Sequence, residues 1–573
     1  MTATIERAES ARPAALPPAW RLCPGCRALL YGEKVMRNAG VCPECGHHFM
    51  LTAAERAALL FDEGSVAVLD VSAPSRDALN FVDTMPYRDR LAKARRSTGL
   101  TEAVLCVEAA IDGKPVVAAI MDFRFLGGSL GAGVGELITQ TAEHSLRTGT
   151  PLLLVCASGG ARMQEGMHSL MQMAKTAGVL ADLDEAGILT IALITDPTYG
   201  GVAASFASLC DVTIAEPRAR LGFAGPRVIA QTTGGKLPPG FQTAEFLLER
   251  GLIDVVIPRP ELRPALSGLL TLTCPAGPGP QPAPEATPEV APEAAPAAAP
   301  QAGPPPDGEP SADPWLAVGL ARDLGRPRSA DFLGSLLSSY LPLRGDRAGA
   351  DCPAILGGIG MLGRQPVAVV AQQKGRTPKE MMAHNFGMAS PAGYRKAGRI
   401  MGLAAKLGIP LITLIDTPGA APGVDAEETG QAMAVAESIR RMLSLRTATL
   451  AVVIGEGGSG GALALGVADR VLALQNAVYS VISPEGCAAI LWRDAAAAPQ
   501  AARALQVDAG SLLQHGMIDG IIAEPPGGAH SDHQLATALL DTALREAVAD
   551  LVSQPVEDLV RRRRKRFREF GDA

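Results

Sequence analysis

Short apolar runs alternate with longer amphipathic stretches through most of this chain. VVAAIMDF, LLLVCAS and TIALITD lie in the first half, and VAVVAQQ, LITLID and LAVVIG lie in the second. Runs of this length, most of them rich in β-branched residues and close to Gly or Pro, predict buried strands. Segments such as GELITQTAEHSLRTG and YRKAGRIMGLAAKLG place apolar residues on one face and end in Gly, which predicts helices. The alternation predicts an α/β fold with largely parallel sheets.

The same phrases occur twice along the chain, in the same order. Three equivalent pairs lie 259 positions apart: Gly128 and Gly387, Pro151 and Pro410, and Gly201 and Gly460. The phrase LLERGLIDVVI returns as LLQHGMIDGII 265 positions later. Ordered matches at a nearly fixed offset predict an internal duplication. Two related lobes placed face to face would form one site between them.

Composition limits the kind of protein. A chain of 573 residues is long enough for several domains, and its 47% hydrophobic content suffices for large cores. No run approaches the roughly 18 apolar residues that a membrane span needs. The stretch MTATIERAESARPAALPPAW holds no apolar signal-peptide core, so we expect a cytoplasmic protein. The net charge of −7 provides no general attraction to nucleic acid.

Composition also divides the chain. We expect a cysteine-bearing head at 20–50, a first lobe at 51–272, a linker at 273–314, a second lobe at 315–560 and a basic tail at 561–573. Residues 275–310 include 13 Pro and 10 Ala, a composition that cannot build a core and predicts a semi-extended tether. At ~3.1 Å per residue, the tether could reach about 110 Å. It is long enough for its lobes to pair within one protomer or with those of another.

Three glycine-rich turns lie between a predicted strand and a predicted helix: SGGA at 158–161, YGGV at 199–202 and SGGA at 459–462. A helix start leaves backbone N–H groups without internal partners, and its dipole favours negative charge. Paired glycines let a ligand approach that backbone, which suits an oxyanion or a phosphate. Alternatively, Gly merely avoids a clash in tight strand–helix packing. Gly-Gly turns at equivalent strand ends in both lobes favour the binding interpretation.

Other catalytic patterns are less convincing. GxGxxG occurs at 358–363 and 455–460, but the first leads into a strand and the second lacks a following acidic residue at 470–484, which disfavours dinucleotide binding. Ser459 lies in a GxSxG pattern, yet Tyr199 stands in its place in the first lobe, which disfavours a Ser nucleophile. No His lies in the turns. Such a site suits chemistry in which a substrate supplies the base, such as thioester enolate formation or carboxyl transfer from N-carboxybiotin.

Longer phrases resemble a known family. CASGGARMQEG, SLMQMAKT, TDPTYGGV and LGFAGPRVI closely resemble the β subunit of bacterial acetyl-CoA carboxylase carboxyltransferase. QKGR, NFGMASPAGYRKA, IDTPGAAPGV, VIGEGGSGGALALG and YSVISPEGCAAILW closely resemble its α subunit. The resemblance implies two duplicated crotonase-like (spiral ββα) lobes on one chain. It also implies transfer of a carboxyl group from biotin on a carrier protein to acetyl-CoA, yielding malonyl-CoA in the first committed step of fatty acid synthesis.

The resemblance assigns roles to individual residues. Two oxyanion sites, one for the thioester enolate and one for biotin, would be formed by the catalytic residues Gly200, Gly201, Gly460 and Gly461. Which turn serves which substrate stays open. A second set would bind or shape the substrate pocket: Gly159, Gly160, Gly419, Lys374 and Arg376. Lys374 and Arg376 are candidates for the CoA phosphates, and the alternative for both is a solvated surface turn.

The resemblance also implies partners. A biotin carboxyl carrier protein would donate the carboxyl group, and a separate biotin carboxylase would load it, because this chain has neither an ATP-grasp domain nor a Met-Lys-Met biotin acceptor. We expect at least a dimer of the fusion. Ala421 stands where the family usually has Tyr, and the α-type N-terminal helical extension is missing. A propionyl-CoA or other acyl-CoA carboxyltransferase is therefore the nearest alternative.

The two ends of the chain carry further signals. Two CxxC pairs predict a structural four-cysteine Zn²⁺ site: Cys23, Cys26, Cys42 and Cys45. The other cysteines are scattered, as expected of reduced thiols. The zinc ribbon could contact nucleic acid as a regulator or cover the entrance for CoA. The basic run RRRRKR at 561–566 could bind phosphate backbones, although such runs are more often solvated helix ends or partners of acidic neighbours.

Overall fold

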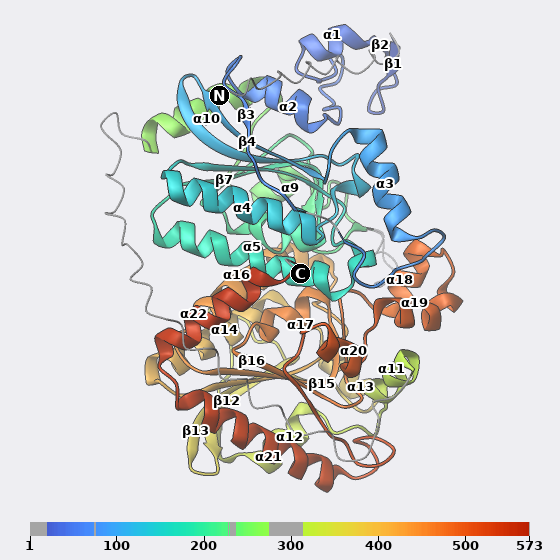
Figure 1. Cartoon of the computed structure of the whole chain (residues 1–573), viewed down its shortest axis with the longest axis vertical. Helices are drawn as coiled ribbons and strands as arrows, with labels where there is room; N and C mark the ends of the chain where they lie inside the picture. The colour runs from blue at the N-terminus through green and yellow to red at the C-terminus, as the bar shows by residue number, and fades with distance from the viewer. Residues whose placement is uncertain (1–19, 74–75, 227–228, 230–236, 274–312, 572–573) are drawn as a thin grey trace, which may run out of the picture.

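The computed structural model describes residues 20–73, 76–226, 229, 237–273 and 313–571. Nearly all of the expected linker at 273–314 lies outside the described residues. Two α/β lobes lie one above the other, and a small cysteine-bearing ribbon lies at the outer end of the first lobe (Figure 1). Within the described ranges, no helix is both long and apolar enough to cross a membrane.

Each lobe contains one mixed sheet of eight described strands. The first is ordered β10-β8-β7-β6-β5-β4-β3, with β9 beside β7. Its strands are β3 (Ala67–Val68), β4 (Val104–Ile111), β5 (Lys114–Met121), β6 (Leu152–Ser158), β7 (Thr190–Tyr199), β8 (Val212–Ala215), β9 (Leu221–Gly222) and β10 (Val255–Val256). Strands β3, β4 and β5 pair antiparallel, and β5 through β10 pair parallel.

The second sheet repeats this topology as β11-β12-β13-β14-β15-β16-β18, with β17 beside β15. Its strands are β11 (Ser338–Pro342), β12 (Ile355–Leu362), β13 (Gln365–Gln372), β14 (Leu411–Thr417), β15 (Thr449–Gly458), β16 (Arg470–Leu474), β17 (Val478–Ser480) and β18 (Gly520–Ile522). The register agrees as well. Ser158 pairs with Thr198 after an irregularity in the first sheet, and Thr417 pairs with Gly457 after the same irregularity in the second. Both partners are displaced by 259 positions, which confirms the duplication.

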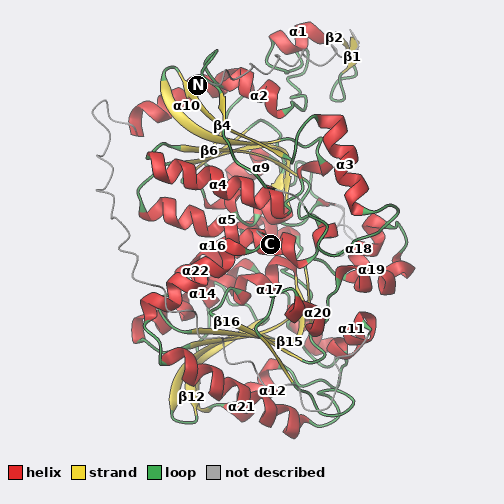
Figure 2. Cartoon of the chain, in the orientation of Figure 1, coloured by secondary structure: helices red, strands yellow, loops and turns green. Residues whose placement is uncertain are grey.

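Helices lie between the two sheets and also on the outer sides of both (Figure 2). The first lobe and its ribbon contribute α1 (Gly32–Arg37), α2 (Ala53–Leu60), α3 (Tyr87–Thr98), α4 (Ala132–Thr148), α5 (Met167–Glu185), α6 (Gly200–Ala203), α7 (Phe206–Leu209), α9 (Ala244–Glu249) and α10 (Arg259–Thr273). The second begins with α11 (Pro314–Arg322), α12 (Ser329–Leu336), α13 (Pro378–Ala383), α14 (Pro391–Leu407), α15 (Val424–Glu428), α16 (Gln431–Ser444) and α17 (Ser459–Gly466). It ends with α18 (Pro484–Leu491), α19 (Ala498–Leu505), α20 (Ala509–Gln514), α21 (His533–Val552) and α22 (Val556–Glu569).

The two lobes pack directly against each other within this chain. Helix α5 of the first lobe contacts α16, α17 and α22 of the second, and one continuous apolar core spans both. The basic run is part of α22, which contacts helices of both lobes. Its Arg564 pairs with Asp182 at 2.9 Å and Arg568 pairs with Glu136 at 2.8 Å. The pairing of Arg564 agrees with the alternative interpretation of the basic run, in which it pairs with acidic neighbours. Helix α22 continues across the expected boundary at 561.

Candidate active site

The two glycine turns of the first lobe, at 158–161 and 199–202, meet where β6 and β7 end, and together they form the first turn of the site. Ser158 ends β6, and Gly200 begins α6 immediately after β7. Gly200 has a φ of 61°, and a Cβ placed there would lie 2.9 Å from the Cα of Gly160, so only glycine fits this approach. The N–H groups of Gly159 and Gly160 donate to Gly127 O at 2.8 Å and to Ser158 Oγ at 3.1 Å. Gly159 and Gly160 therefore shape the turn, and the N–H groups at the start of α6 have no intrahelical partners.

The second turn of the site, formed by residues 417–420 and 459–461, repeats this construction where β14 and β15 end. The Gly419 N–H donates to Thr417 Oγ1 at 3.2 Å, as Gly160 does to Ser158. Ser459 has a φ of 52° and occupies the position equivalent to Gly200. A Cβ at Gly461 would lie 2.4 Å from the backbone N of Ala420. The start of α17 is therefore in backbone contact with the turn that follows β14.

The two turns approach the same side chain from opposite lobes. A Cβ at Gly201 would lie 3.4 Å from Met173 Cγ, and one at Gly460 would lie 3.2 Å from Met173 Cε. Met173 belongs to α5 and is buried. The structure thus brings together the glycines expected at the site, and places both helix starts against one buried methionine within a single chain.

A buried polar network supports the first turn. Arg162 follows the turn and donates to both oxygens of Glu102 at 2.7 and 2.8 Å, and to Ser129 O at 2.9 Å. Glu165 accepts the Ala132 N–H at the start of α4 at 2.5 Å, and burial raises the pKa of its carboxyl. Sequence reasoning did not single out Arg162, Glu102 or Glu165. The polar residues of RMQE directly after the glycines were the available signal.

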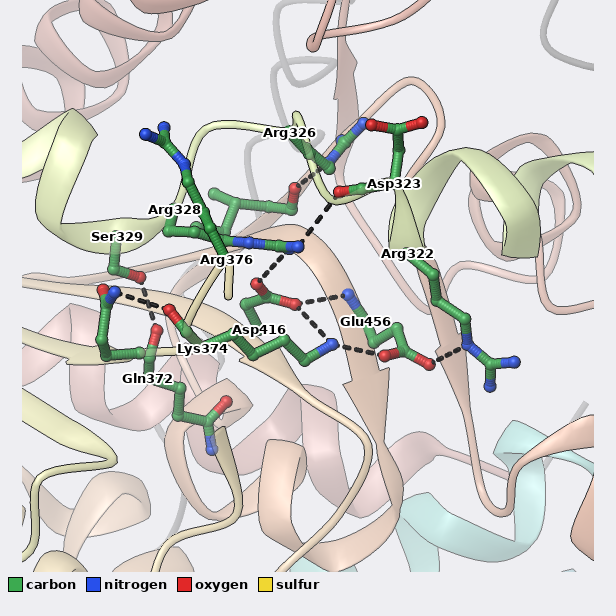
Figure 3. A network of polar contacts seen from close by, with 12 residues as sticks. Arg322, Asp323, Arg326, Arg328, Ser329, Gln372, Lys374, Arg376, Asp416 and Glu456 are labelled. Atoms are coloured by element: carbon green, nitrogen blue, oxygen red, sulfur yellow. Dashed lines mark hydrogen bonds and ion pairs between the residues drawn. The ribbon is translucent and has the colours of Figure 1, made fainter. Parts of the chain in front are cut away.

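A different network surrounds the end of the second sheet (Figure 3). Lys374 lies between Asp416, at 3.0 Å, and Glu456. Arg322 Nε is 2.6 Å from Glu456, and Arg328 is 3.2 Å from Asp416. Although burial opposes ionisation, Lys374 and Arg322 lower the pKa of Glu456 to about 2.

This network places Lys374 inside the protein rather than in a solvated surface turn. Its side chain is only 10% exposed and forms two ion pairs within the protein. Lys374 lies two residues after the end of β13, and its side chain points toward the ends of the neighbouring strands rather than toward solvent. Arg376 lies farther along the same loop. Its guanidinium is 40% exposed and pairs with Asp331 at 2.7 Å.

One carboxylate joins the lobes close to both turns. Glu427 of α15 accepts the N–H groups of Phe223 at 3.1 Å and Ala224 at 2.8 Å, which belong to the first lobe. The ring of Phe223 would lie 3.4 Å from a Cβ at Gly460. Within the described part of the chain no side chain forms an ion pair with Glu427, and burial raises the pKa of its carboxyl to about 7. Sequence reasoning missed Glu427, because its partners are backbone groups about two hundred positions away.

The ribbon encloses a cavity against the first lobe. The ribbon itself consists of α1 and the antiparallel strands β1 (Trp20–Leu22) and β2 (Leu29–Tyr31). Arg259 of the first lobe attaches to the ribbon by donating to Gly40 O at 3.2 Å and to Phe49 O at 3.0 Å. The cavity is about 250 Å³ and extends to Phe123 and Ala157, at the ends of β5 and β6. It therefore opens beside the first glycine turn.

Three family models match successive parts of the chain. A zinc finger domain of acetyl-CoA carboxylase matches 20–45, a carboxyl transferase domain matches 51–243, and an acetyl co-enzyme A carboxylase carboxyltransferase-like family matches 310–571. The chain is 58% identical to the acetyl-coenzyme A carboxylase carboxyl transferase subunits beta/alpha of Parafrankia sp. (strain EAN1pec), over 96% of this chain and 91% of that protein. The same subunits of Salinispora tropica are 53% identical, over 97% and 96%.

The chain belongs to this family of fused acetyl-coenzyme A carboxylase carboxyl transferase subunits. It is therefore a transferase that carries a carboxyl group from carboxybiotin to acetyl-CoA and yields malonyl-CoA for fatty acid synthesis. The expected fold of two crotonase-like lobes with a zinc ribbon is confirmed. The solved transcarboxylase 12S is 22% identical and covers 91% of this chain and 92% of its own, with a TM-score of 0.34, which is too low to bear on the argument.

The cysteine cluster of the enzyme fits the expected structural zinc. The four Sγ atoms of Cys23, Cys26, Cys42 and Cys45 all lie within 4.8 Å of one another. The Sγ atoms of Cys23 and Cys45 are 3.6 Å apart, and those of Cys26 and Cys42 are 3.9 Å apart. Zn–S bonds of about 2.3 Å in a tetrahedron place sulfurs at such separations. Four thiolates complete the coordination shell, so the metal stabilises the ribbon and takes no part in the chemistry.

Proposed function

We propose that the helix starts at Gly200–Gly201 and Gly460–Gly461 are the two oxyanion sites of the carboxyl transfer. One observation carries the proposal: two equivalent glycine turns, one from each of the duplicated lobes, both contact one side chain, Met173. Each turn ends a parallel strand and begins a helix, where free N–H groups and the helix dipole favour an anion. One turn would hold the enolate oxygen of the thioester, and the other the ureido oxygen of biotin.

The proposed steps need no side-chain base. Carboxybiotin releases CO₂, and the electron pair of the broken C–N bond stays on biotin as an anion that one turn stabilises. This anion takes a proton from the methyl group of acetyl-CoA. The other turn stabilises the resulting enolate, whose carbon then attacks CO₂ to form malonyl-CoA. Removing one oxyanion donor typically costs ~10²–10³ in rate.

We propose that the ribbon covers the entrance for CoA. The cavity beneath it reaches the strand end beside the first turn, and Arg218 lines it with an exposed side chain. Arg218 is a candidate for a CoA phosphate in place of Lys374. Arg376 remains a second candidate, although its pairing with Asp331 would have to open.

We propose that the enzyme works with other chains. The family reaction requires a biotin carboxyl carrier protein as donor and a biotin carboxylase to load it. The resemblance also implies at least a dimer of the fusion, in which the β-like lobe of one chain faces the α-like lobe of another. The contact between lobes within this chain would then coexist with a contact between copies.

Ala421 bears on which acyl group the enzyme accepts. Ala421 is buried beside the second turn, and its N–H donates to Ala389 O at 3.1 Å. Its methyl group stands where the family usually has a Tyr ring. A pocket enlarged there would favour propionyl-CoA or a longer acyl-CoA over acetyl-CoA.

The reverse reaction tests both points. Purified protein with biocytin and malonyl-CoA should release acetyl-CoA, and methylmalonyl-CoA should react more slowly. Gly461→Ala should reduce kcat by about 10²–10³, because its Cβ would lie 2.4 Å from Ala420 N. Gly268→Ala is the matched control, since a Cβ there meets nothing within 4 Å. Full activity of Gly461→Ala would reject the site, and faster turnover of methylmalonyl-CoA would change the substrate.

A further inference from the structure

We propose that Lys374, Asp416 and Glu456 are positioning residues that hold the second glycine turn in place. Lys374 would lock the ends of three adjacent strands, and thereby fix the N–H groups at the start of α17 against the turn after β14. The inference rests on the proposed function, because it assigns this role relative to the oxyanion site at Gly460 and Gly461.

The three residues lie at the ends of three neighbouring strands. Lys374 follows β13, Asp416 lies one residue before the end of β14, and Glu456 lies two before the end of β15. Lys374 Nζ is 3.0 Å from Asp416 Oδ1 and also pairs with Glu456. The same Asp416 oxygen accepts the backbone N–H of Glu456 at 3.0 Å. The contacts therefore join side chains and backbone across all three strands.

The strand ends leave the turn little room to move. Two residues after Glu456, a Cβ at Gly458 would lie 2.1 Å from the carbonyl oxygen of Pro418, which itself lies two residues after Asp416. On the other side, a Cβ at Gly387 would lie 2.7 Å from Asp416 O and 2.9 Å from Lys374 Cγ. Displacing either strand end would move the N–H groups that follow it. A misplacement of about 1 Å can cost 10²-fold in rate.

The first lobe shows that the fold itself does not need these charges. Asp416 and Glu456 correspond, at the offset of 259, to Ala157 and Pro197. Strand β5 ends at Met121 and β13 at Gln372, so Lys374 corresponds to Phe123. The duplicated sheet is therefore built without the ion pairs in one lobe and with them in the other. Buried ion pairs are costly to desolvate, which argues for a use specific to the second turn.

Two arginines next to the cluster allow Lys374 to be replaced without leaving either carboxylate unpaired. Arg322 pairs with Glu456 at 2.6 Å and with Glu485 at 2.6 Å, and Arg328 pairs with Asp416. Each carboxylate next to Lys374 thus keeps one arginine when Lys374 is replaced. We therefore expect Lys374→Met to fold and to retain zinc.

The test compares Lys374→Met with Arg563→Met in the reverse reaction. Arg563 is also buried and pairs with Asp469 at 2.6 Å, at the opposite end of β15, where Asp469 accepts the Thr449 N–H. Lys374→Met should lower kcat at least about tenfold, with the KM for malonyl-CoA changed less than about threefold, because no member of the triad lines the ribbon cavity. Arg563→Met should lower the melting temperature and leave kcat unchanged. Unchanged kcat in Lys374→Met, or an equal loss in Arg563→Met, would overturn the proposal.

A double-mutant cycle and a conservative variant complete the test. Glu456→Gln should also lower kcat, and the double variant with Lys374→Met should lose little more than the worse single variant, because both act through one contact. Lys374→Arg keeps the charge and should recover part of kcat; it carries the test if Lys374→Met fails to fold. Additive losses, or no recovery, would contradict the positioning role. If Gly461→Ala is inactive and the Lys374 variants are fully active, only this inference fails, whereas an active Gly461→Ala rejects the proposed function itself.

Discussion

At the scale of single residues, Glu427 is a carboxylate that two lobes share. It is 4% exposed and accepts two backbone N–H groups from the opposite lobe, with Gln242 beside it, and none of the residues that the structure describes forms an ion pair with it. Burial raises its pKa to about 7, whereas an unfolded chain would hold it near 4.5. The folded enzyme therefore binds more protons than the unfolded chain between these two values.

The linkage predicts a pH dependence. The contribution of Glu427 to the free energy of unfolding is complete below about pH 4.5 and is lost as the pH rises through about 7, by at most about 1.4 kcal/mol per pH unit. Melting temperatures measured from pH 5 to 8 should therefore fall more steeply in the wild type than in Glu427→Gln. Parallel curves for the two proteins would show that Glu427 does not titrate in this range.

The sequence predicted the glycine turns of the site more successfully than its charged side chains. The glycine turns were predictable because a Gly-Gly pair between strand and helix is a local backbone requirement. Lys374 was not, because QKGR is typical of a solvent-exposed turn and its two partners lie 42 and 82 positions away. Arg162 and Glu102 escaped notice for the same reason, since their pairing spans 60 positions. A charged side chain shows its partner only once the strands are placed beside one another.

At the scale of elements, the zinc ribbon is a separate unit held to the first lobe by a few polar contacts. Its own apolar cluster is small, consisting of Cys23, Leu30, Val35 and Cys42 with a few partly buried neighbours. So few apolar side chains cannot stabilise a fold of this size without the metal. Arg259, through Phe49 O, and Glu216, through His48, connect the ribbon to the lobe beside the cavity.

Loss of the metal should therefore unfold the ribbon selectively. Cys42→Ser should reduce bound zinc below one ion per chain, expose the ribbon to protease and leave the melting of the lobes nearly unchanged. If the ribbon covers the CoA entrance, the KM for malonyl-CoA should rise about tenfold, the equivalent of one lost hydrogen bond to a charged group. Cys106→Ser, a buried cysteine outside the cluster, is the control for zinc content. An unchanged KM would reject the covering role.

At the scale of the whole molecule, α22 ties the lobes together. It belongs to the second lobe in sequence, but Arg564 and Arg568 pair with acidic residues of α4 and α5. Phe567 is 2% exposed and lines a space between Ala174 of the first lobe and Leu443 of the second. Helix α22 thus stabilises the contact between lobes, and four of its arginines are committed to ion pairs within the protein.

Removing the buried ring should weaken that contact. Phe567→Ala should destabilise the folded chain by about 3–5 kcal/mol, the usual cost of deleting a buried phenyl ring. The measurement is the urea midpoint of the transition that separates the lobes. Lys565→Ala on the same helix is the control, because its side chain is 68% exposed. Equal midpoints for the two variants would mean that α22 does not join the lobes.

The sequence by itself determined the duplicated α/β architecture, the four zinc ligands and the glycine turns. Each of these depends on spacing along the chain: the strand period, the CxxC separation, the helix start and the fixed offset between repeats. Only the tertiary structure decided that Lys374 is internal, that Glu427 joins the lobes and that α22 covers the first lobe. Those outcomes depend on which distant segments meet, and on the cost of burying a charge, which no local pattern records.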